Sequence, residues 1–295
     1  MDNKRAKKYM NEGTITPDHV IRIKPFPLFI GREKFKKNIK LKKLLKNEIN
    51  KYREKYERYF VQNSNKSGTS KIMLDSCPNI IFLQDVGMIA VGKTKKESQI
   101  AIGIAEQNIS VIKDIEKTSK FKSISKKALF DMEYWSLEQA KLNKVKKELQ
   151  GKVVAITGGL GKIGFETYKL FKDKGAEVVI LDVNRKLIHE FRKQYDDLCI
   201  ECDVSNKSSV SRSFSKIISE LGGLDILVSN AGYAPQGMIA EISDNELRKS
   251  FDNNFFAHQN CASIATKIFI DQNIKGCLLF NISKQAVNPG KSFGP

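Results

Sequence analysis

A glycine-rich run is the feature of this sequence that most directly indicates chemistry: Thr157-Gly158-Gly159-Leu160-Gly161-Lys162-Ile163-Gly164. Glycines let the backbone turn tightly and approach a pyrophosphate, whose charge then meets the free N–H groups of a following helix. Asp182 follows eighteen residues after Gly164. An acid at such a spacing accepts hydrogen bonds from ribose hydroxyls and repels a 2′-phosphate. The pattern therefore predicts a dinucleotide site that favours NAD over NADP, although the nearby cations Arg185 and Lys162 weaken this preference.

The elements that must position this loop follow a strand–helix rhythm from Gly151 onward. Short apolar, β-branched runs occupy residues 153–156, 178–181, 198–201, 226–228 and 277–281, with helical segments between them. Alternating strands and helices are typical of a parallel sheet covered by helices on both faces. We therefore expect an α/β fold, a Rossmann-like doubly wound parallel sheet, with the glycine loop between its first strand and first helix.

Residues 151–295 resemble the first half of a short-chain dehydrogenase/reductase. The glycine spacing is seen in that family, although Lys162 replaces the middle glycine of its usual pattern. The segment Asn230-Ala231-Gly232 is similar to the family's loop after the fourth strand, and Asp203-Val204 to its adenine-contacting pair. The resemblance implies a set of cofactor-binding residues: Gly158, Gly161, Ile163, Gly164, Asp182, Asp203, Val204, Asn230, Ala231 and Gly232.

The same resemblance implies two catalytic residues. Ser283 matches the family's substrate-polarising serine, and Asn254 its helix asparagine that holds a proton-relay water. The family places a catalytic Tyr and a Lys shortly beyond that serine, and this sequence ends at Pro295, at or just before that point. Oxidising an alcohol requires a base to take its proton. We therefore expect residues 1–295 to bind NAD weakly at best and to lack turnover on their own.

Residues 1–150 carry a resemblance of their own, in segments 16–22, 87–94 and 133–142. They resemble bifunctional class II aldolase/short-chain dehydrogenase proteins, in which an aldolase domain precedes the dehydrogenase. Members similar to rhamnulose-1-phosphate aldolase/alcohol dehydrogenase would cleave a phosphorylated deoxyketose and oxidise the aldehyde with NAD. We expect a partial class II aldolase-like α/β domain over 1–120, a linker with a helix over 121–150, and an NAD(P)-binding domain over 151–295, incomplete at its carboxyl end.

The aldolase resemblance implies zinc, which polarises a ketose carbonyl and is held by imidazoles. Only three histidines are present, and His189 and His258 fall on expected helices of the second half. His19 is the one candidate ligand, and a single ligand cannot make a zinc site. The pair Cys199 and Cys202 has metal-like spacing, but its place in an expected strand favours a structural role.

Charge and composition set the remaining limits. The net charge of +18 lies mostly in residues 1–150, which hold 33 Lys and Arg against 17 Asp and Glu. This asymmetry keeps open an alternative function, a non-catalytic NAD-sensing or nucleic-acid-binding protein. We expect no nucleic acid, no membrane partner, a sugar-phosphate or aldehyde substrate, and a homo-oligomer in the complete protein. The odd number of cysteines, 5, favours a reducing, cytoplasmic compartment.

Local patterns predict further elements in the first half. Prolines predict an irregular segment over residues 1–30, and apolar spacing predicts a helix over 33–62. Two short apolar runs, 79–83 and 88–91, predict a hairpin. Thr94 and Glu97 have the spacing of a capping box at the start of a helix that reaches residue 117. A final helix is expected over 136–149.

Overall fold

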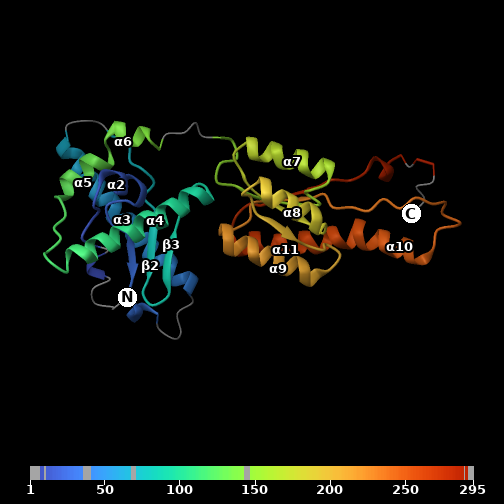
Figure 1. The fold of residues 1–295 in the computed structure, drawn as a ribbon, viewed down its shortest axis with the longest axis horizontal. Helices are drawn as coiled ribbons and strands as arrows, with labels where there is room; N and C mark the ends of the chain where they lie inside the picture. Colours follow the sequence, from blue (N-terminus) through green and yellow to red (C-terminus); the bar gives the residue numbers. More distant parts are fainter. Residues whose placement is uncertain are drawn as a thin grey trace. The chain divides into compact units, whose positions relative to one another are not determined.

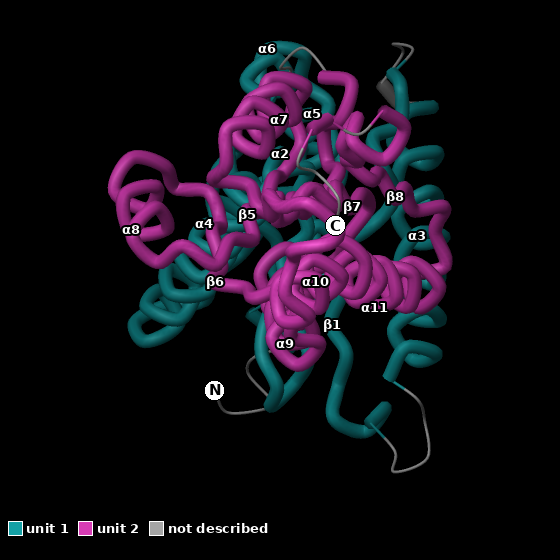
Figure 2. Tube along the Cα trace, turned by 90° about the vertical axis from the view of Figure 1, so that its right-hand side faces the viewer, with its two compact units in different colours: residues 1–145 teal, residues 146–295 magenta. Residues whose placement is uncertain are grey.

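The computed structural model describes residues 7–9, 11–35, 41–67, 71–142, 147–288 and 290–291. The chain divides into two compact units, Met1–Val145 and Lys146–Pro295, which Figure 2 shows in different colours. Each unit has its own sheet and its own hydrophobic clusters.

The second unit contains a five-stranded parallel sheet with the order β6-β5-β4-β7-β8. Its strands are β4 (Val153–Thr157), β5 (Glu177–Asp182), β6 (Cys199–Glu201), β7 (Ile226–Ser229) and β8 (Cys277–Phe280). The chain winds outward from β4 in one direction and then from β7 in the other, so the strand order reverses between these two strands. Ligands of open α/β sheets bind at the carboxyl ends of the strands at such a switch point. The expected doubly wound sheet and its five strands are confirmed.

Helices cover both faces of this sheet (Figure 1). Side chains alternate along a strand, so Val154 and Ile156 join one core cluster with α7 (Lys162–Asp173) and α8 (Arg185–Gln194). Val153 and Ala155 join the other, with α9 (Lys207–Leu221) and α11 (Ala257–Gln272). Every residue of β4 is buried, as in strands packed on both sides. The remaining elements are α10 (Asp244–Phe251), the π-helix η2 (Asp252–Phe256) and η3 (Lys284–Ala286).

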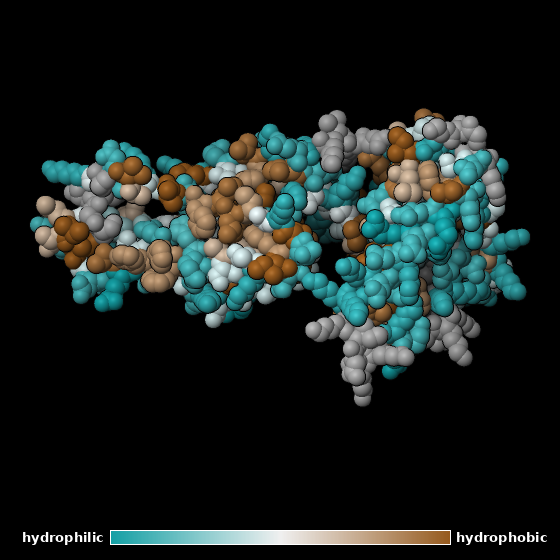
Figure 3. Space-filling view, turned by 180° about the vertical axis from the view of Figure 1, so that it is seen from behind, coloured by the Kyte–Doolittle hydropathy of each residue, from teal (hydrophilic) through white to brown (hydrophobic). Residues whose placement is uncertain are grey.

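The strand β8 pairs only with β7 among the described residues, and it lies at the edge of the sheet. Its sequence Cys-Leu-Leu-Phe is apolar without alternation, which is typical of a strand buried on both faces. Yet Leu279 and Phe280 are exposed, and Ile282 just beyond them is exposed too. Figure 3 shows exposed apolar side chains gathered on one face of the second unit. The expectation of a homo-oligomer stays a prediction.

The first unit is built on a three-stranded sheet of order β1-β2-β3. Strand β1 (Leu28–Ile30) runs parallel to β2 (Ile80–Leu83), and β3 (Gly87–Ala90) pairs antiparallel with β2, which confirms the expected hairpin. The helices are α2 (Pro17–Ile23), α3 (Leu41–Ser67), α4 (Lys95–Ile115), α5 (Lys126–Glu133) and α6 (Ser136–Ala140), with the short η1 (Arg32–Lys34).

Two expectations for the amino-terminal half were wrong. Residues 17–23 are helical because Pro17 stands in the first turn, where its missing N–H costs nothing, and the Thr16 side chain accepts a hydrogen bond from the N–H of His19. Residues 28–30 form a strand because they pair with β2. The segment expected as a linker, residues 121–150, also contributes to the core of the first unit. Phe130 of α5 and Tyr134, the residue after α5, both belong to a core cluster of that unit.

Other boundaries moved. The helix expected over 33–62 corresponds to α3, which begins at Leu41 and ends at Ser67. The helix expected over 136–149 corresponds to α6, which ends at Ala140. Residues 36–40 and 143–146, which we expected within these helices, lie outside the described residues. At Thr94 the side chain accepts from Glu97 N–H as expected, but the Glu97 carboxylate accepts from the N–H of Lys93 instead of Thr94. In the described part of the chain, no helix is both long and apolar enough to cross a bilayer.

Candidate functional site

The glycine-rich run from the end of β4 into the first turn of α7 is packed so closely that two of the three glycines at the predicted spacing have no room for a side chain. A Cβ on Gly164 would lie 2.3 Å from the carbonyl oxygen of Gly158 and 2.8 Å from the Cα of Gly159. Gly158 has a φ of +59°, and a Cβ there would lie 2.9 Å from the Cα of Ala231. Gly161 is less constrained, because its Cβ would meet only the Gly158 oxygen, at 3.3 Å. The spacing that suggested a nucleotide loop thus has a steric basis at two of its three positions.

The helix that follows this loop begins with uncapped amides. Gly161 is the N-cap of α7 and supplies no side-chain hydrogen bond, and the first turn of α7 contains no acidic residue. The first N–H groups of a helix have no partner within the helix and lie at its positive dipole end. The amides of α7 are therefore suited to an anionic group. Ile163 lies in this first turn and is 64% exposed.

Asp182 is the last residue of β5, the strand beside β4, and the glycine loop holds its carboxylate. One carboxylate oxygen accepts from the N–H of Leu160 at 3.0 Å, and the other accepts from the N–H of Asn184 at 3.0 Å. The acid is thus held rigidly next to the loop. Each carboxylate oxygen has further lone pairs that can accept from a ligand.

The loop after β7 is bonded directly to the glycine loop. The hydroxyl oxygen of Thr157 accepts from the N–H groups of Asn230 and Ala231, at 2.9 and 3.0 Å. The side-chain amide of Asn230 donates to the carbonyl oxygens of Thr157 and Gly158, at 3.0 and 3.2 Å. The structure therefore brings together the two loops that the sequence analysis placed separately at the cofactor.

Three polar residues missed by the sequence analysis support these loops. Asn281, just after β8, donates from its side chain to the Asn230 side-chain oxygen at 2.8 Å. Ser229 is buried, and its hydroxyl pairs with Nδ1 of His258 on α11 at 2.6 Å. Burial lowers the pKa of His258, which keeps the imidazole neutral at neutral pH. Asn281 directly after β8 and Ser229 at the end of β7 could have been noticed from their position at strand ends, whereas nothing in the sequence singled out His258 on α11.

Asn254 lies in the π-helix η2, and its side chain holds the loop after β7 in place. Its oxygen accepts from the N–H of Tyr233 at 2.8 Å, while its amide donates to the Tyr233 carbonyl at 2.7 Å. Single π turns within helices are frequent at functional sites. Both polar atoms of this side chain are engaged within the fold, and its role in a proton relay stays a prediction.

The other expected site residues lie in turns after strands. Ser283 is exposed, three residues beyond β8, and its hydroxyl accepts from the N–H of Gln285. Asp203 follows β6, and its carboxylate accepts from the N–H and hydroxyl of Ser205 at 3.0 and 2.7 Å. Val204 packs against the core cluster shared with α9. These placements leave their proposed contacts with substrate and adenine as predictions.

The first unit does not provide a metal site among its described residues. His19 is buried, and its Nδ1 lies 2.6 Å from the hydroxyl of Thr16. Its Nε2 is buried without a hydrogen-bond partner, and burial lowers the pKa of the ring. In the described ranges no three His, Cys, Asp or Glu side chains come together as a ligand set. The described residues of the first unit therefore do not fit a zinc ion.

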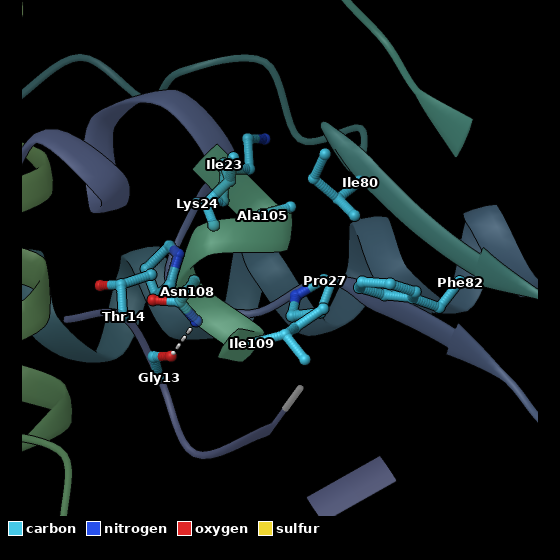
Figure 4. Close-up of a pocket in the computed structure, with 11 residues that line it drawn as sticks. Gly13, Thr14, Ile23, Lys24, Pro27, Ile80, Phe82, Ala105, Asn108 and Ile109 are labelled. Carbon is cyan, nitrogen blue, oxygen red and sulfur yellow. Dashed lines mark hydrogen bonds between the residues drawn. The ribbon is translucent and has the colours of Figure 1, made fainter. Parts of the chain in front are cut away.

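A small pocket in the first unit is lined mainly by apolar side chains (Figure 4). Ile23, Ile80 and Ile109 contribute to it, and Asn108 donates to the carbonyl of Gly13 at its rim, at 3.1 Å. The side chains that line it include no acid, histidine or cysteine. The pocket thus offers no set of catalytic groups.

Several buried polar residues of the first unit form a network that the sequence did not indicate. Tyr56 donates to the Glu133 carboxylate at 2.6 Å, and its hydroxyl lies 2.8 Å from that of Tyr134. The ammonium group of Lys24 lies 4.0 Å from the centre of the Tyr56 ring. Burial raises the pKa of Glu133 to about 7, against the opposing effects of Tyr56 and Lys24.

Cys199 lies in β6, and Cys202 directly follows that strand. Both thiols are free and buried. Burial raises the pKa of each, to about 12 for Cys199. A thiol held protonated in this way is a poor metal ligand and nucleophile.

Comparison with known proteins gives each unit a separate family. Residues 152–295 match the family described as short chain dehydrogenase, and residues 1–142 match the family described as aldolase class II, second domain. An uncharacterized oxidoreductase of Bacillus subtilis (strain 168), YuxG, is 28% identical over 290 residues, which cover 95% of this chain and 42% of that protein. Short chain aldehyde dehydrogenase 1 of Euphorbia lathyris is 39% identical over 146 residues, covering 48% of this chain and 50% of the relative.

A solved structure is also similar to the second half. The aldohexose dehydrogenase AldT of Thermoplasma acidophilum, in ligand-free form, is 30% identical, with a TM-score of 0.44 over 48% of this chain and 53% of that chain. The chain spans about half the length of the curated relatives it matches.

Fold and site together define the second unit as a doubly wound α/β domain with a nucleotide-type glycine loop. Residues 152–295 belong to the short-chain dehydrogenase family, and residues 1–142 form a class II aldolase domain. The chain therefore joins an aldolase-type domain to a dehydrogenase domain, in the order that the resemblance implied.

Proposed function

We propose that the second unit binds NAD(H) and contributes an NAD-dependent oxidation or reduction to the complete protein. The observation that carries this proposal is the steric cradle at Gly158 and Gly164, next to the uncapped amides of α7. Such a cradle lets a pyrophosphate approach the backbone, and the helix dipole favours its charge. The carboxylate of Asp182, fixed at the adjacent strand end, would accept hydrogen bonds from the ribose hydroxyls.

The chain's own residues would then divide the remaining work. Bound NAD supplies a hydride acceptor. The loop after β7, fastened by Thr157 and Asn254, would form the wall against the cofactor. The hydroxyl of Ser283 would donate a hydrogen bond to the substrate oxygen, which polarises it. Asn254 would order a water that carries protons away.

We also propose that residues 1–295 do not complete a turnover alone. The hydroxyl of Tyr168 donates to Asp197 at 2.7 Å, and that of Tyr233 donates to Glu246 at 2.6 Å. Tyr195 stacks on Phe191, with ring centroids 4.7 Å apart. The hydroxyls of Tyr168 and Tyr233 are thus engaged, and Tyr195 caps the carboxyl end of α8, which leads into the amino end of β6, opposite the strand ends that carry the site. None of the three is therefore placed to act as the base that alcohol oxidation requires.

For the whole protein we propose cleavage of a ketose phosphate by the class II aldolase part, followed by oxidation of the released aldehyde. This rests on the joining of the two families in one chain. Because the described residues of the first unit offer no zinc ligand set, residues 1–295 should bind no zinc tightly and stoichiometrically. We further propose a cytoplasmic location, since all five cysteines are free thiols.

Titration calorimetry tests the cofactor proposal. NAD added to residues 1–295 should give saturable heat with one site per chain, and an assay with alcohols and aldehydes should give no NADH. The absence of any heat with both NAD and NADH, from protein shown to be folded by circular dichroism, would overturn the proposal. Alcohol-dependent NADH production would overturn only the claim about turnover.

A further inference from the structure

A charged pair lies where the adenosine ribose of the proposed cofactor would be held. Asp182 ends β5 and Glu201 ends β6, and the parallel register places these two residues opposite each other. Arg185 is the first residue of α8, three positions after Asp182. One arginine therefore lies near two carboxylates at the same edge of the sheet.

The arginine is already bound. Its Nε donates to the Glu201 carboxylate at 2.8 Å, between side chains that are 82% and 48% exposed. The carboxylate of Asp182 accepts instead from backbone N–H groups of the glycine loop and of the following turn. Arg185 is thus directed toward β6 and not left free beside Asp182.

Arginine is the residue best suited to a phosphate dianion, because its planar group donates several hydrogen bonds at once. In dinucleotide-binding domains a nearby arginine accommodates the 2′-phosphate that distinguishes NADP from NAD. A carboxylate that occupies this arginine keeps it from the 2′-phosphate, which disfavours NADP.

We propose that Glu201 is a specificity-determining residue, which restricts the site to NAD(H) by pairing with Arg185. The inference rests on the proposed binding of NAD(H). It resolves a conflict within the sequence, in which Asp182 favours NAD while Arg185 favours NADP. Glu201, which lies 16 residues after Arg185, binds the arginine and so keeps it from a 2′-phosphate.

The test compares NAD and NADP binding to residues 1–295 and to Glu201→Gln, by calorimetry at fixed ionic strength. The glutamine keeps the size of the side chain and removes its charge. Exposed ion pairs are weak. We therefore expect NADP affinity to rise by up to about fivefold, because Arg185 no longer has to leave Glu201 in order to bind the phosphate. NAD affinity should stay within about twofold, because NAD has no group for Arg185 to bind.

Three variants make the test specific. Glu190→Gln removes another exposed acid, on α8, and should leave both affinities unchanged. Arg185→Gln should have little effect alone, yet it should abolish the gain when combined with Glu201→Gln. The same comparison in an Asp182→Ser background raises NADP affinity into a measurable range if the wild type binds it too weakly.

The outcomes separate the two claims. If the wild type binds NAD but Glu201→Gln does not gain NADP affinity in either background, Glu201 has no role in selection. If the gain persists without Arg185, then plain charge repulsion or another cation such as Lys162 explains it, and the inference is wrong. If the folded wild type binds neither NAD nor NADH, the proposed function fails, and this inference fails with it.

Discussion

The two units of this chain differ in whether their buried polar groups have hydrogen-bond partners. In the described residues, five buried side-chain polar atoms lack a hydrogen-bond partner, and all of them belong to the first unit: Thr14 Oγ1, His19 Nε2, Tyr59 Oη, Ser123 Oγ and Glu133 Oε2. In the second unit, the side chains of Thr157 and Asn230 make four hydrogen bonds to backbone groups of the two site loops. The unpaired groups of the first unit are costly, since an unsatisfied buried polar atom loses its hydration.

This difference shows which part of each unit is fixed by polar contacts. The second unit fixes a site through backbone packing and through side chains that bond backbone groups, so the site is formed before any ligand binds. In the first unit, buried polar groups instead form a tyrosine–glutamate network among aromatic rings. We therefore expect ligand binding to respond to changes in the second unit, and pH-dependent stability to respond to changes in the first.

The largest expected effect comes from Gly164→Ala. Its Cβ would meet the backbone of Gly158 and Gly159, which cannot move without breaking the contact with Asn230. Overpacking of this kind costs about 1–3 kcal/mol, which corresponds to a loss of NAD affinity of up to about 100-fold. Calorimetry and thermal unfolding measure both effects.

The matched control is Gly161→Ala, whose Cβ would meet a single atom at 3.3 Å. It should lose no more than about tenfold in affinity. Equal losses in the two variants would show that the glycine loop is not a steric cradle, and the contrast between the units would lose its basis.

The next effect concerns the first unit and its pH dependence. The pKa of Glu133 is raised to about 7, so the folded state keeps a proton that the unfolded chain releases near pH 4.5. Stability should therefore fall as pH rises from about 4.5 to 7, by about 3 kcal/mol. Glu133→Gln should remove this fall while keeping an oxygen that accepts from Tyr56.

Fluorescence of Trp135, the single tryptophan, reports urea unfolding of the first unit at each pH. The exposed Asp131→Asn, on the same helix, is the control and should keep the wild-type slope. Because the lowered pKa of His19 acts in the opposite direction, the wild type is compared with Glu133→Gln, and a stability difference between them that is flat or rises across this window would contradict the assigned cause.

A smaller effect is expected for Asp182→Asn. An amide can accept at only one of its two ends, so either Leu160 or Asn184 loses its partner. We expect NAD affinity to fall by about tenfold, since a charge-assisted hydrogen bond is lost. The exposed Asp196→Asn should bind NAD like the wild type. An unchanged affinity in Asp182→Asn would mean that the ribose is held elsewhere.

The last test changes no residue and asks whether the interior of the second unit is closed to solvent. Cys277 is exposed, whereas Cys199, Cys202 and Cys261 are buried with raised pKa values, about 12 for Cys199 and Cys261. Iodoacetamide should label Cys277 at least about 100 times faster than these three under native conditions. Peptide mass spectrometry follows each site, and urea should equalise the rates. Rapid native labelling of Cys199 or Cys202 would reopen a redox role for the pair.

The second unit was largely predictable because its signals are local. The strands and helices, the glycine loop and Asp182 can each be recognised from a short stretch of sequence, because the local periodicity indicates the secondary structure. The first unit was less predictable. Pro17 suggested a break although it begins a helix, and residues 28–30 form a strand only because β2 lies beside them.

The sequence by itself determined the doubly wound fold, the place of the nucleotide loop and the joining of two families, because each depends on residues close together in the chain. The tertiary structure alone decided which groups meet: Asn230 with Thr157 across 73 positions, Glu133 with Tyr56 across 77, and Arg185 with Glu201 across 16. Pairing between distant segments leaves no periodic signal. It depends on how strands and helices pack, and that packing sets the burial, and with it the pKa and the specificity, of each group.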